Sequence, residues 1–221
     1  MATSGTTAFA PDIADLIEDA YELAGLEMRT GYQLRTARRS LDFLMIEWAN
    51  RGYNLWLVDE SSFTTTSGTT TYNLDTDCVD VIEMTLVLSD STERVLKRIP
   101  AVDYMRISNK ASTAKPTLVW VNRQLARPVA NLWQVPDATY TVKYWHLRRV
   151  EDTGAGGNTP DVPFRFLPAM VAGLAHKLAA KSNDQTQRVP LLEAEYEKQL
   201  ALAAQEDREK TSFYIRPRGL A

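Results

Sequence analysis

The stretch LMIEWANRGYNLW, Leu44 to Trp56, contains the change from a helical to an extended pattern on which the fold depends. From about Gln33 to Asn50, apolar residues recur at the three- and four-residue spacing of an amphipathic helix. The buried side of this helix is expected to comprise Leu34, Ala37, Leu41, Leu44, Met45 and Trp48. Gly52 is expected to end the helix, because glycine readily adopts the left-handed conformation of a helix terminus. The short apolar run Leu55 to Val58 then begins a region with strand propensity.

A shorter helix is expected before this stretch, from Pro11 to Gly25. Proline is favourable in a first helical turn, where its missing N–H has no partner to lose. The apolar stripe of this helix is Ile13, Leu16, Ile17, Ala20 and Ala24, and its acidic residues are Asp12, Asp15, Glu18, Asp19 and Glu22. Two helices joined by a short link are expected to pack antiparallel as a hairpin.

The middle of the chain has the pattern of an antiparallel β region. Thr-rich segments on either side of Ser67-Gly68 predict a β-hairpin. Ile82, Met84, Leu86 and Leu88 alternate with less apolar residues, which predicts a half-buried strand with Arg94 to Ile99 paired back on it. The remaining predicted elements are a short helix at Pro100–Ile107 and strands at Thr117–Asn122, Val129–Val135 and Tyr140–Leu147.

Helices return after the stretch EDTGAGGNTPDVP, which is predicted to be a linker because it combines glycines with prolines. The first has Phe166, Met170, Leu174 and Leu178 on one face, and the second has Leu192, Tyr196, Leu200 and Ala204. We therefore expect an α+β fold with two C-terminal helices packed against the N-terminal pair. The predicted parts are a discontinuous helical domain (1–53 and 160–210), an antiparallel β domain (54–150) and an extended C-terminal arm (211–221).

The composition excludes several classes of protein. The 221 residues are 44% hydrophobic and 24% charged, which are ordinary globular proportions. Cys78 is the single cysteine, so no intramolecular disulfide can form. The longest apolar run, Leu167 to Ala175, is too short to cross a bilayer, and no secretory signal is expected at the start. The net charge is −3, whereas a general nucleic-acid binder normally carries a basic excess, so DNA contact would be limited to a local patch.

No catalytic constellation is found among the residues that usually form one. His146 and His176 lie on different predicted elements, no G-x-S-x-G turn accompanies either, and both are expected to be structural. A thiol nucleophile would need a histidine beside Cys78, and the sequence offers no sign of that pairing.

Metal and nucleotide motifs are incomplete in the same way. Asp75, Asp77 and Asp80 lack the central glycine and closing glutamate of a calcium loop, which favours a solvated turn. The GAGG segment at 154–157 lacks the following Lys-Ser/Thr of a phosphate-binding loop. We expect no catalytic, metal-binding or cofactor-binding residues and no enzymatic activity.

The densest basic group comprises Arg29, Arg35, Arg38 and Arg39. One interpretation is a solvated helix face partnered by carboxylates of the first helix. The other is a basic stripe, Arg35, Arg38 and Arg39, that faces a DNA channel or a neighbouring subunit. Trp48 and Trp56 are expected to be structural anchors, because aromatic side chains dominate cores and interfaces.

These motifs occur in an order that resembles one family. LMIEWANRGYNLW contains the pair Glu47-Trp48, a glycine and Asn-Leu-Trp, and it is followed by the segments Tyr72–Leu74, DYMRISNK (103–110), Leu132–Asp137 and Pro160–Pro163. From about Ile13 to Leu202 the chain resembles the head-to-tail adaptor proteins of short-tailed bacteriophages, also called tail tubular protein A. One departure is Asn73-Leu74-Asp75, where relatives often place a proline, so the turn geometry stays open there.

The resemblance implies a structural virion protein that is assembled in the cytoplasm of the bacterial host. It implies a ring, usually of twelve copies, that joins the portal of the filled head to the tail nozzle, continues the DNA channel and helps retain the genome. The helical part would meet the portal and the β part the next tail component. From the residues themselves we expect only weak contact with DNA, no membrane and no cofactor. A carboxy-terminal arm that docks into the portal would here comprise Phe213, Tyr214, Ile215, Arg216 and Arg218.

Two other functions stay open from the residues. The scaffold also suits another neck or tail-completion ring protein, which only the identity of the partner would distinguish. A DNA-binding regulator built on the first two helices belongs to a different class, and it predicts salt-dependent gel retardation by residues 1–53. An enzyme with an unrecognised pocket in the β region is disfavoured by the scarcity of histidine.

Overall fold

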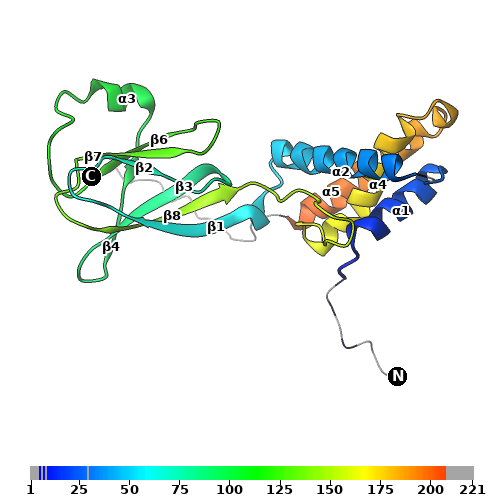
Figure 1. Ribbon diagram of the computed structural model, residues 1–221, viewed down its shortest axis with the longest axis horizontal. Helices are drawn as coiled ribbons and strands as arrows, with labels where there is room; N and C mark the ends of the chain where they lie inside the picture. Colours follow the sequence, from blue (N-terminus) through cyan, green and yellow to red (C-terminus); the bar gives the residue numbers. More distant parts are fainter. Residues whose placement is uncertain (1–4, 6, 8, 29, 208–221) are drawn as a thin grey trace, which may run out of the picture. The chain divides into compact units, whose positions relative to one another are not determined.

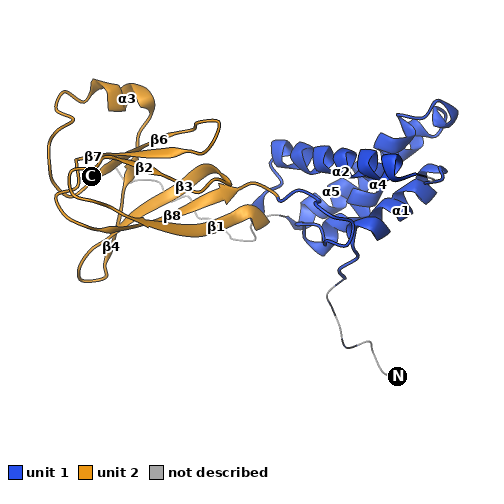
Figure 2. Cartoon of the chain, in the orientation of Figure 1, with its two compact units in different colours: residues 1–55, 151–221 blue, residues 56–150 orange. Residues whose placement is uncertain are grey.

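The computed structural model describes residues 5, 7, 9–28 and 30–207. The chain divides into two compact units, residues 1–55 with 151–221 and residues 56–150 (Figure 1, Figure 2). Helices form the first unit and two sheets dominate the second, so the predicted α+β class is confirmed. No helix in the described residues is both long and apolar enough to cross a membrane.

Among its described residues, the helical unit contains four α-helices: α1 (Ile13–Ala24), α2 (Gly31–Arg51), α4 (Leu167–Ala179) and α5 (Val189–Glu206). Short 3-10 turns, η2 (Phe164–Phe166) and η3 (Asn183–Gln185), precede α4 and α5. The Asp12 carboxylate caps α1 by accepting the N–H of Asp15, and Thr30 with Gln33 forms a capping box at the start of α2. Gly25 and Gly52 end these helices with φ of 70° and 87°, as the left-handed terminus requires.

Helix α4 is the central element of this unit, because it contacts α1, α2 and α5. Most residues of α4 are buried, so burial is not confined to one stripe of the helix, and many of these residues are alanine or glycine. At Gly173 a Cβ atom would lie 2.8 Å from the Tyr196 ring and 3.0 Å from Leu44 Cδ1. Glycine at this position therefore allows α4 to approach both α2 and α5.

The second unit holds two four-stranded sheets. One has the order β1 (Val58–Thr64), β8 (Thr141–Arg148), β3 (Cys78–Val87), β4 (Glu93–Val95). The other has the order β2 (Thr71–Asn73), β7 (Val129–Trp133), β6 (Leu118–Asn122), β5 (Lys97–Arg98). Every strand pair described is antiparallel except β5 with β6. The short helix α3 (Ala101–Arg106) follows β5, as predicted.

Both sheets contribute to one core, which makes the second unit a β-sandwich. Its buried members are Leu74, Cys78, Val81, Met84, Leu86, Leu96, Val119, Val121, Ala130, Leu132, Val142 and Tyr144. Strand β8 shows the alternation that this packing needs, because Val142, Tyr144 and His146 are buried while Thr141 and Trp145 are exposed.

The β-hairpin predicted around Ser67-Gly68 is wrong. Strand β1 pairs with β8 in one sheet, and β2 pairs with β7 in the other. The chain crosses between the sheets at residues 65–70, and the rings of Phe63 and Tyr72 stack with centroids 4.8 Å apart. The segment Arg94 to Ile99 is divided similarly, since β4 pairs with β3 and β5 pairs with β6. Local strand propensity does not choose a pairing partner, and burial of both inner faces does.

The predicted linker after β8 is attached to the helical unit. The carbonyls of Asn158 and Gly156 accept hydrogen bonds from the N–H groups of Ile13 and Ala14 at 2.8 and 2.9 Å. These N–H groups belong to the first turn of α1 and have no partner within the helix. Gly156 of the GAGG segment and the adjacent Asn158 thus occupy, with their carbonyl oxygens, two of the N–H groups that a phosphate would need at this helix N-terminus.

Candidate functional site

The basic stripe Arg35, Arg38 and Arg39 lies on α2, where Arg35 and Arg39 are exposed and Arg38 is half-buried. Together with Asp42 and the segment 152–154, the three arginines line a shallow depression of about 380 Å³. All of these residues belong to the helical unit. Arg29, which the sequence places in the same basic group, lies outside the described residues.

Arg38 differs from Arg35 and Arg39 because its guanidinium forms a hydrogen bond within the chain. Its Nη1 donates a hydrogen bond of 2.7 Å to the carbonyl of Gly154. One residue earlier, the N–H of Thr153 donates to Asp42 Oδ1 at 3.0 Å. Arg38 and Asp42 therefore hold the segment after β8 against α2, which is a structural task.

Arg35 and Arg39 keep their guanidinium groups toward solvent. Within the described part of the chain, neither forms an ion pair with a carboxylate of α1. They lie on a face that also carries large apolar side chains at helical spacing: Tyr32, Phe43 and Ile46 are 68%, 59% and 51% exposed. We refer to Tyr32, Arg35, Arg39, Phe43 and Ile46 as the α2 outer face.

Helix α1 presents the opposite charge. Asp15, Glu18, Asp19 and Glu22 are all exposed, and their spacing of three, four and seven residues places them on one side of the helix. We refer to these four residues as the α1 acidic face. One helical unit thus displays a basic and apolar surface on α2 and an acidic surface on α1.

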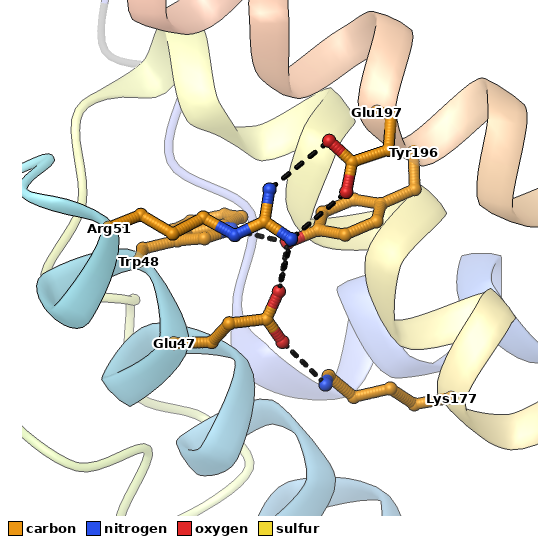
Figure 3. Close-up of polar contacts among 6 residues, drawn as sticks. All are labelled: Glu47, Trp48, Arg51, Lys177, Tyr196 and Glu197. Carbon is orange, nitrogen blue, oxygen red and sulfur yellow. Dashed lines mark hydrogen bonds and ion pairs between the residues drawn. The ribbon is translucent and has the colours of Figure 1, made fainter.

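A network of polar side chains joins α2, α4 and α5 beside Trp48 (Figure 3). The indole Nε1 of Trp48 donates to the Tyr196 hydroxyl at 3.0 Å, and this hydroxyl donates to Glu47 Oε1 at 3.0 Å. Lys177 Nζ donates to Glu47 Oε2 at 2.8 Å, so a cation from α4 approaches one carboxylate oxygen. The other oxygen accepts from Arg51 Nη2 at 2.8 Å.

Arg51 extends this network to the surface of α5. Its two terminal nitrogens donate to both carboxylate oxygens of Glu197, at 3.1 and 2.9 Å. This two-pronged geometry matches the planar guanidinium and strengthens the pair. Hydrogen bonding to Glu197, together with the Glu47 charge, raises the pKa of the Arg51 guanidinium above its usual range.

The pKa values of Glu47 and Tyr196 are shifted from their ordinary values. Burial alone would raise the pKa of Glu47, but the hydrogen bond and charge of Lys177, with Tyr196 and Arg51, lower it below its ordinary value. Burial raises the pKa of Tyr196 above its ordinary range. Glu47 is therefore ionised and Tyr196 neutral at neutral pH, which is the state in which every hydrogen bond described can form.

The two tryptophans expected to be anchors have different environments. Trp48 is 1% exposed, and its ring lies 5.4 Å from that of Phe166. Trp56 lies in the 3-10 turn η1 (Leu55–Leu57) and is half-buried. The residues expected to dock into a portal, Phe213, Tyr214, Ile215, Arg216 and Arg218, lie outside the described residues.

The two histidines and the cysteine, which were the candidates for catalysis, lie in different surroundings. His176 lies in α4 and stacks against Tyr196 at 6.5 Å, whereas His146 lies in β8 of the other unit. Cys78 is buried, and burial raises the pKa of its thiol to about 12, so it is a poor nucleophile.

The three aspartates of the acidic cluster, Asp75, Asp77 and Asp80, do not share the same neighbours. Asp80 forms ion pairs with Arg98 at 2.7 Å and with Arg123 at 3.6 Å. Asp75 and Asp77 instead lie beside His146, with one possible ligand atom of each within 4.8 Å of the others. Sequence reasoning missed this grouping, because strand register rather than spacing brings His146 to the two aspartates.

Comparison with known proteins adds one finding. The model of a family described as SU10 adaptor protein matches residues 8–218, which includes both units. No curated protein sequence matches the chain.

Proposed function

Because this chain belongs to the SU10 adaptor protein family, a family of phage head-tail adaptors, we propose that it forms a ring between the portal of the filled head and the tail nozzle. In this position the ring continues the DNA channel and helps retain the packaged genome. The observation that carries the proposal is the family match across 8–218, since it includes the helices and the sandwich alike. No bond-making chemistry is required of any residue.

The division into two units suits a protein that joins two different partners. Each unit has its own core: the helical unit packs around α4, and the sandwich packs between its sheets. The polar network at Glu47 further stiffens the helical unit, because it joins three helices through one carboxylate. We assign the helical unit to the portal side and the sandwich to the tail side.

The charges on α1 and α2 supply a way to close a ring. Contacts in a ring are head-to-tail, so the two surfaces that meet are different patches of the same chain. The α2 outer face of one copy is complementary in charge to the α1 acidic face of the next. Phe43 and Ile46 would add apolar burial to that contact, and large exposed apolar residues are typical of interfaces.

Residues 211–221 are assigned to the portal from their sequence. The segment TSFYIRPRGLA is too short for a core of its own and carries two aromatic and two basic residues. Binding such a segment in a groove of the portal would cost about 1–2 kcal/mol of backbone entropy per residue, which apolar contacts must offset. Phe213 and Tyr214 would provide the apolar contacts there.

Contact with DNA is proposed to be weak. The net charge of −3 disfavours tight general binding, and a weakly interacting channel lets the duplex pass during ejection. A ring subunit also differs from a DNA-binding regulator in one measurable respect. The regulator would retard duplex DNA in a salt-dependent manner as a free protein, and the adaptor would not.

Electron microscopy of the full chain mixed with its portal tests the function. A second ring stacked on the portal is the expected result, and the free chain alone serves as the control. Failure of any density to appear on the portal, together with salt-dependent retardation of DNA by the free chain, would replace the adaptor proposal by the regulator.

A further inference from the structure

We propose that Asp75, Asp77 and His146 bind one divalent transition-metal ion in the sandwich unit. A carboxylate oxygen of each aspartate and a ring nitrogen of His146 lie within 4.8 Å of one another. Two oxygens and one nitrogen leave further coordination positions for water. This inference does not depend on the proposed adaptor function.

The histidine is the first observation that points to a ligand. His146 is 2% exposed and lies on the inward side of β8, yet its Nδ1 is buried without a hydrogen-bond partner. A buried polar atom that lacks a partner is destabilising, and few occur in native proteins. Coordination of an ion through Nδ1 would give this atom the polar interaction that it lacks.

The two aspartate carboxylates supply negative charge and make the proposed site accessible to an ion from solvent. Both belong to the connection between β2 and β3, and both are exposed, so an ion reaches them from solvent. The nearby His146 is buried, which places the proposed ion at the boundary between solvent and core. An ion of charge +2 would balance the two carboxylates.

Neighbouring hydroxyl groups hold one ligand in place. The Tyr144 hydroxyl donates to Asp75 Oδ2 at 2.8 Å and accepts the N–H of Asp75 at 3.2 Å. Ser61 from β1 also forms a side-chain hydrogen bond to Asp75. Hydrogen bonds of this kind orient carboxylate ligands in metal sites. Strands β1 and β8 thus position Asp75 beside the His146 ring.

The donor set selects the kind of ion. Calcium and magnesium prefer oxygen ligands, whereas an imidazole nitrogen suits zinc and its first-row neighbours. Zinc accepts histidine and carboxylate together and commonly keeps a water when three protein ligands bind it. A bound ion would fasten the connection between β2 and β3 to β8.

The first experiment measures zinc binding by calorimetry. Full-length protein treated with a chelator and dialysed is titrated with Zn²⁺ alone, and one ion per chain is expected. Asp77→Asn should weaken binding by at least about tenfold, since even residues that only orient ligands change metal affinity by 10–100-fold. Asp103→Asn is the matched control, because Asp103 is an exposed aspartate of α3 in the same unit.

A second measurement identifies the nitrogen ligand without removing the buried histidine. The chain has two histidines, so their ring signals in NMR spectra are easily distinguished. Zinc should shift the ring signals of His146 and leave those of His176 in place. Ca²⁺ and Mg²⁺ should cause no such shift.

Three results would overturn the proposal. The first is an absence of zinc binding by folded wild-type protein. The second is zinc binding that Asp77→Asn leaves as strong as Asp103→Asn does. The third is binding that shifts only His176 or neither ring.

Discussion

The indole nitrogen of Trp48 donates a hydrogen bond of 3.0 Å to the hydroxyl of Tyr196, although 148 positions separate the two residues in the chain. Both side chains are almost fully buried. The contact joins the two sequence segments of the helical unit, because Trp48 precedes residues 56–150 and Tyr196 follows them. The Tyr196 hydroxyl in turn donates to Glu47, which also accepts hydrogen bonds from Arg51 and Lys177.

Removal of the Trp48 side chain should destabilise the helical unit strongly. Trp48→Ala is expected to lower the free energy of unfolding by about 3–5 kcal/mol, because it deletes a buried ring and the donor to Tyr196. Trp48→Phe retains most of the ring and should cost less. Urea denaturation followed by circular dichroism measures both variants. A loss below about 1 kcal/mol for Trp48→Ala would show that the ring is not an anchor.

Gly173→Ala should destabilise the protein, although alanine normally favours helix over glycine by about 1 kcal/mol. The new Cβ would lie 2.8 Å from the Tyr196 ring and 3.0 Å from Leu44 Cδ1, so either the buried Tyr196 ring or α4 itself must shift. The expected cost is about 1–3 kcal/mol. Gly31→Ala in α2 is the matched control, since a Cβ there meets nothing within 4 Å. Equal melting temperatures for the two variants would contradict close packing at Gly173.

The contribution of Glu47 should depend on pH. Its pKa is lower in the folded chain than its ordinary value of 4.5, so protonation favours the unfolded state. The stabilisation by its ionised form is therefore fully present above about pH 5 and declines as the pH falls below 4.5 through the folded pKa. Glu47→Gln should cost about 1–3 kcal/mol at pH 7.

Urea titrations of wild type and Glu47→Gln at pH 7 and at pH 3.5 test this dependence. The difference in unfolding free energy between them should shrink at the lower pH. Glu83→Gln on β3 controls for the loss of a carboxylate, because Glu83 is exposed. A difference that stays constant across the two pH values would show that the charge of Glu47 is not what stabilises the network.

Charge reversal on the α2 outer face should impair ring assembly. Arg35→Glu with Arg39→Glu would place like charges opposite the α1 acidic face of the neighbouring copy, while Arg38 and its bond to Gly154 stay intact. Addition of Glu18→Arg and Glu22→Arg in the same chain should restore assembly, because attraction is re-established with the signs exchanged. Ring formation on the portal is counted by electron microscopy.

Arg94→Glu with Arg106→Glu makes the same change of charge on exposed residues of the sandwich unit and serves as the control. Normal rings from the Arg35/Arg39 double variant would show that α1 and α2 do not meet across subunits. Altered genome retention in otherwise normal rings would instead assign these arginines to the channel wall.

Deletion of residues 211–221 should leave both units folded and abolish docking to the portal. The deleted segment contains Phe213 and Tyr214, the apolar residues proposed to enter a portal groove. Circular dichroism checks the fold, and capture of the truncated chain by purified portal measures docking. Capture at wild-type strength would discard the arm from the proposal.

Much of the helical unit could be predicted from local pattern. The apolar spacing in α1 and α2 and the stops at Gly25 and Gly52 are local properties, and the structure confirms them. The predicted strands at 117–122, 129–135 and 140–147 correspond to β6, β7 and β8 for the same reason. Each of these features depends only on residues that are close in the sequence, within two turns of a helix or along one strand.

The pairing of distant segments could not be predicted in this way. Thr-rich segments around Gly68 have the propensity for a hairpin, yet they join different sheets because the sandwich needs both inner faces covered. The glycine-rich stretch 154–157 has the composition of a linker, yet the carbonyls of Gly156 and of the adjacent Asn158 accept hydrogen bonds from the N-terminus of α1. The glycine content of this stretch predicts that its backbone can adopt many conformations. The N–H groups of Ile13 and Ala14, which are distant in the sequence, determine where it binds.

The sequence by itself determined which segments are helical or extended, the single thiol, the net charge and the resemblance to phage adaptors, because these are properties of neighbouring residues or of their order. Only the tertiary structure decided that Arg38 binds Gly154 while Arg35 and Arg39 stay exposed, and that His146 lies beside Asp75 and Asp77. Those contacts join residues far apart in the chain, and their geometry arises from packing and strand register, which no local pattern specifies.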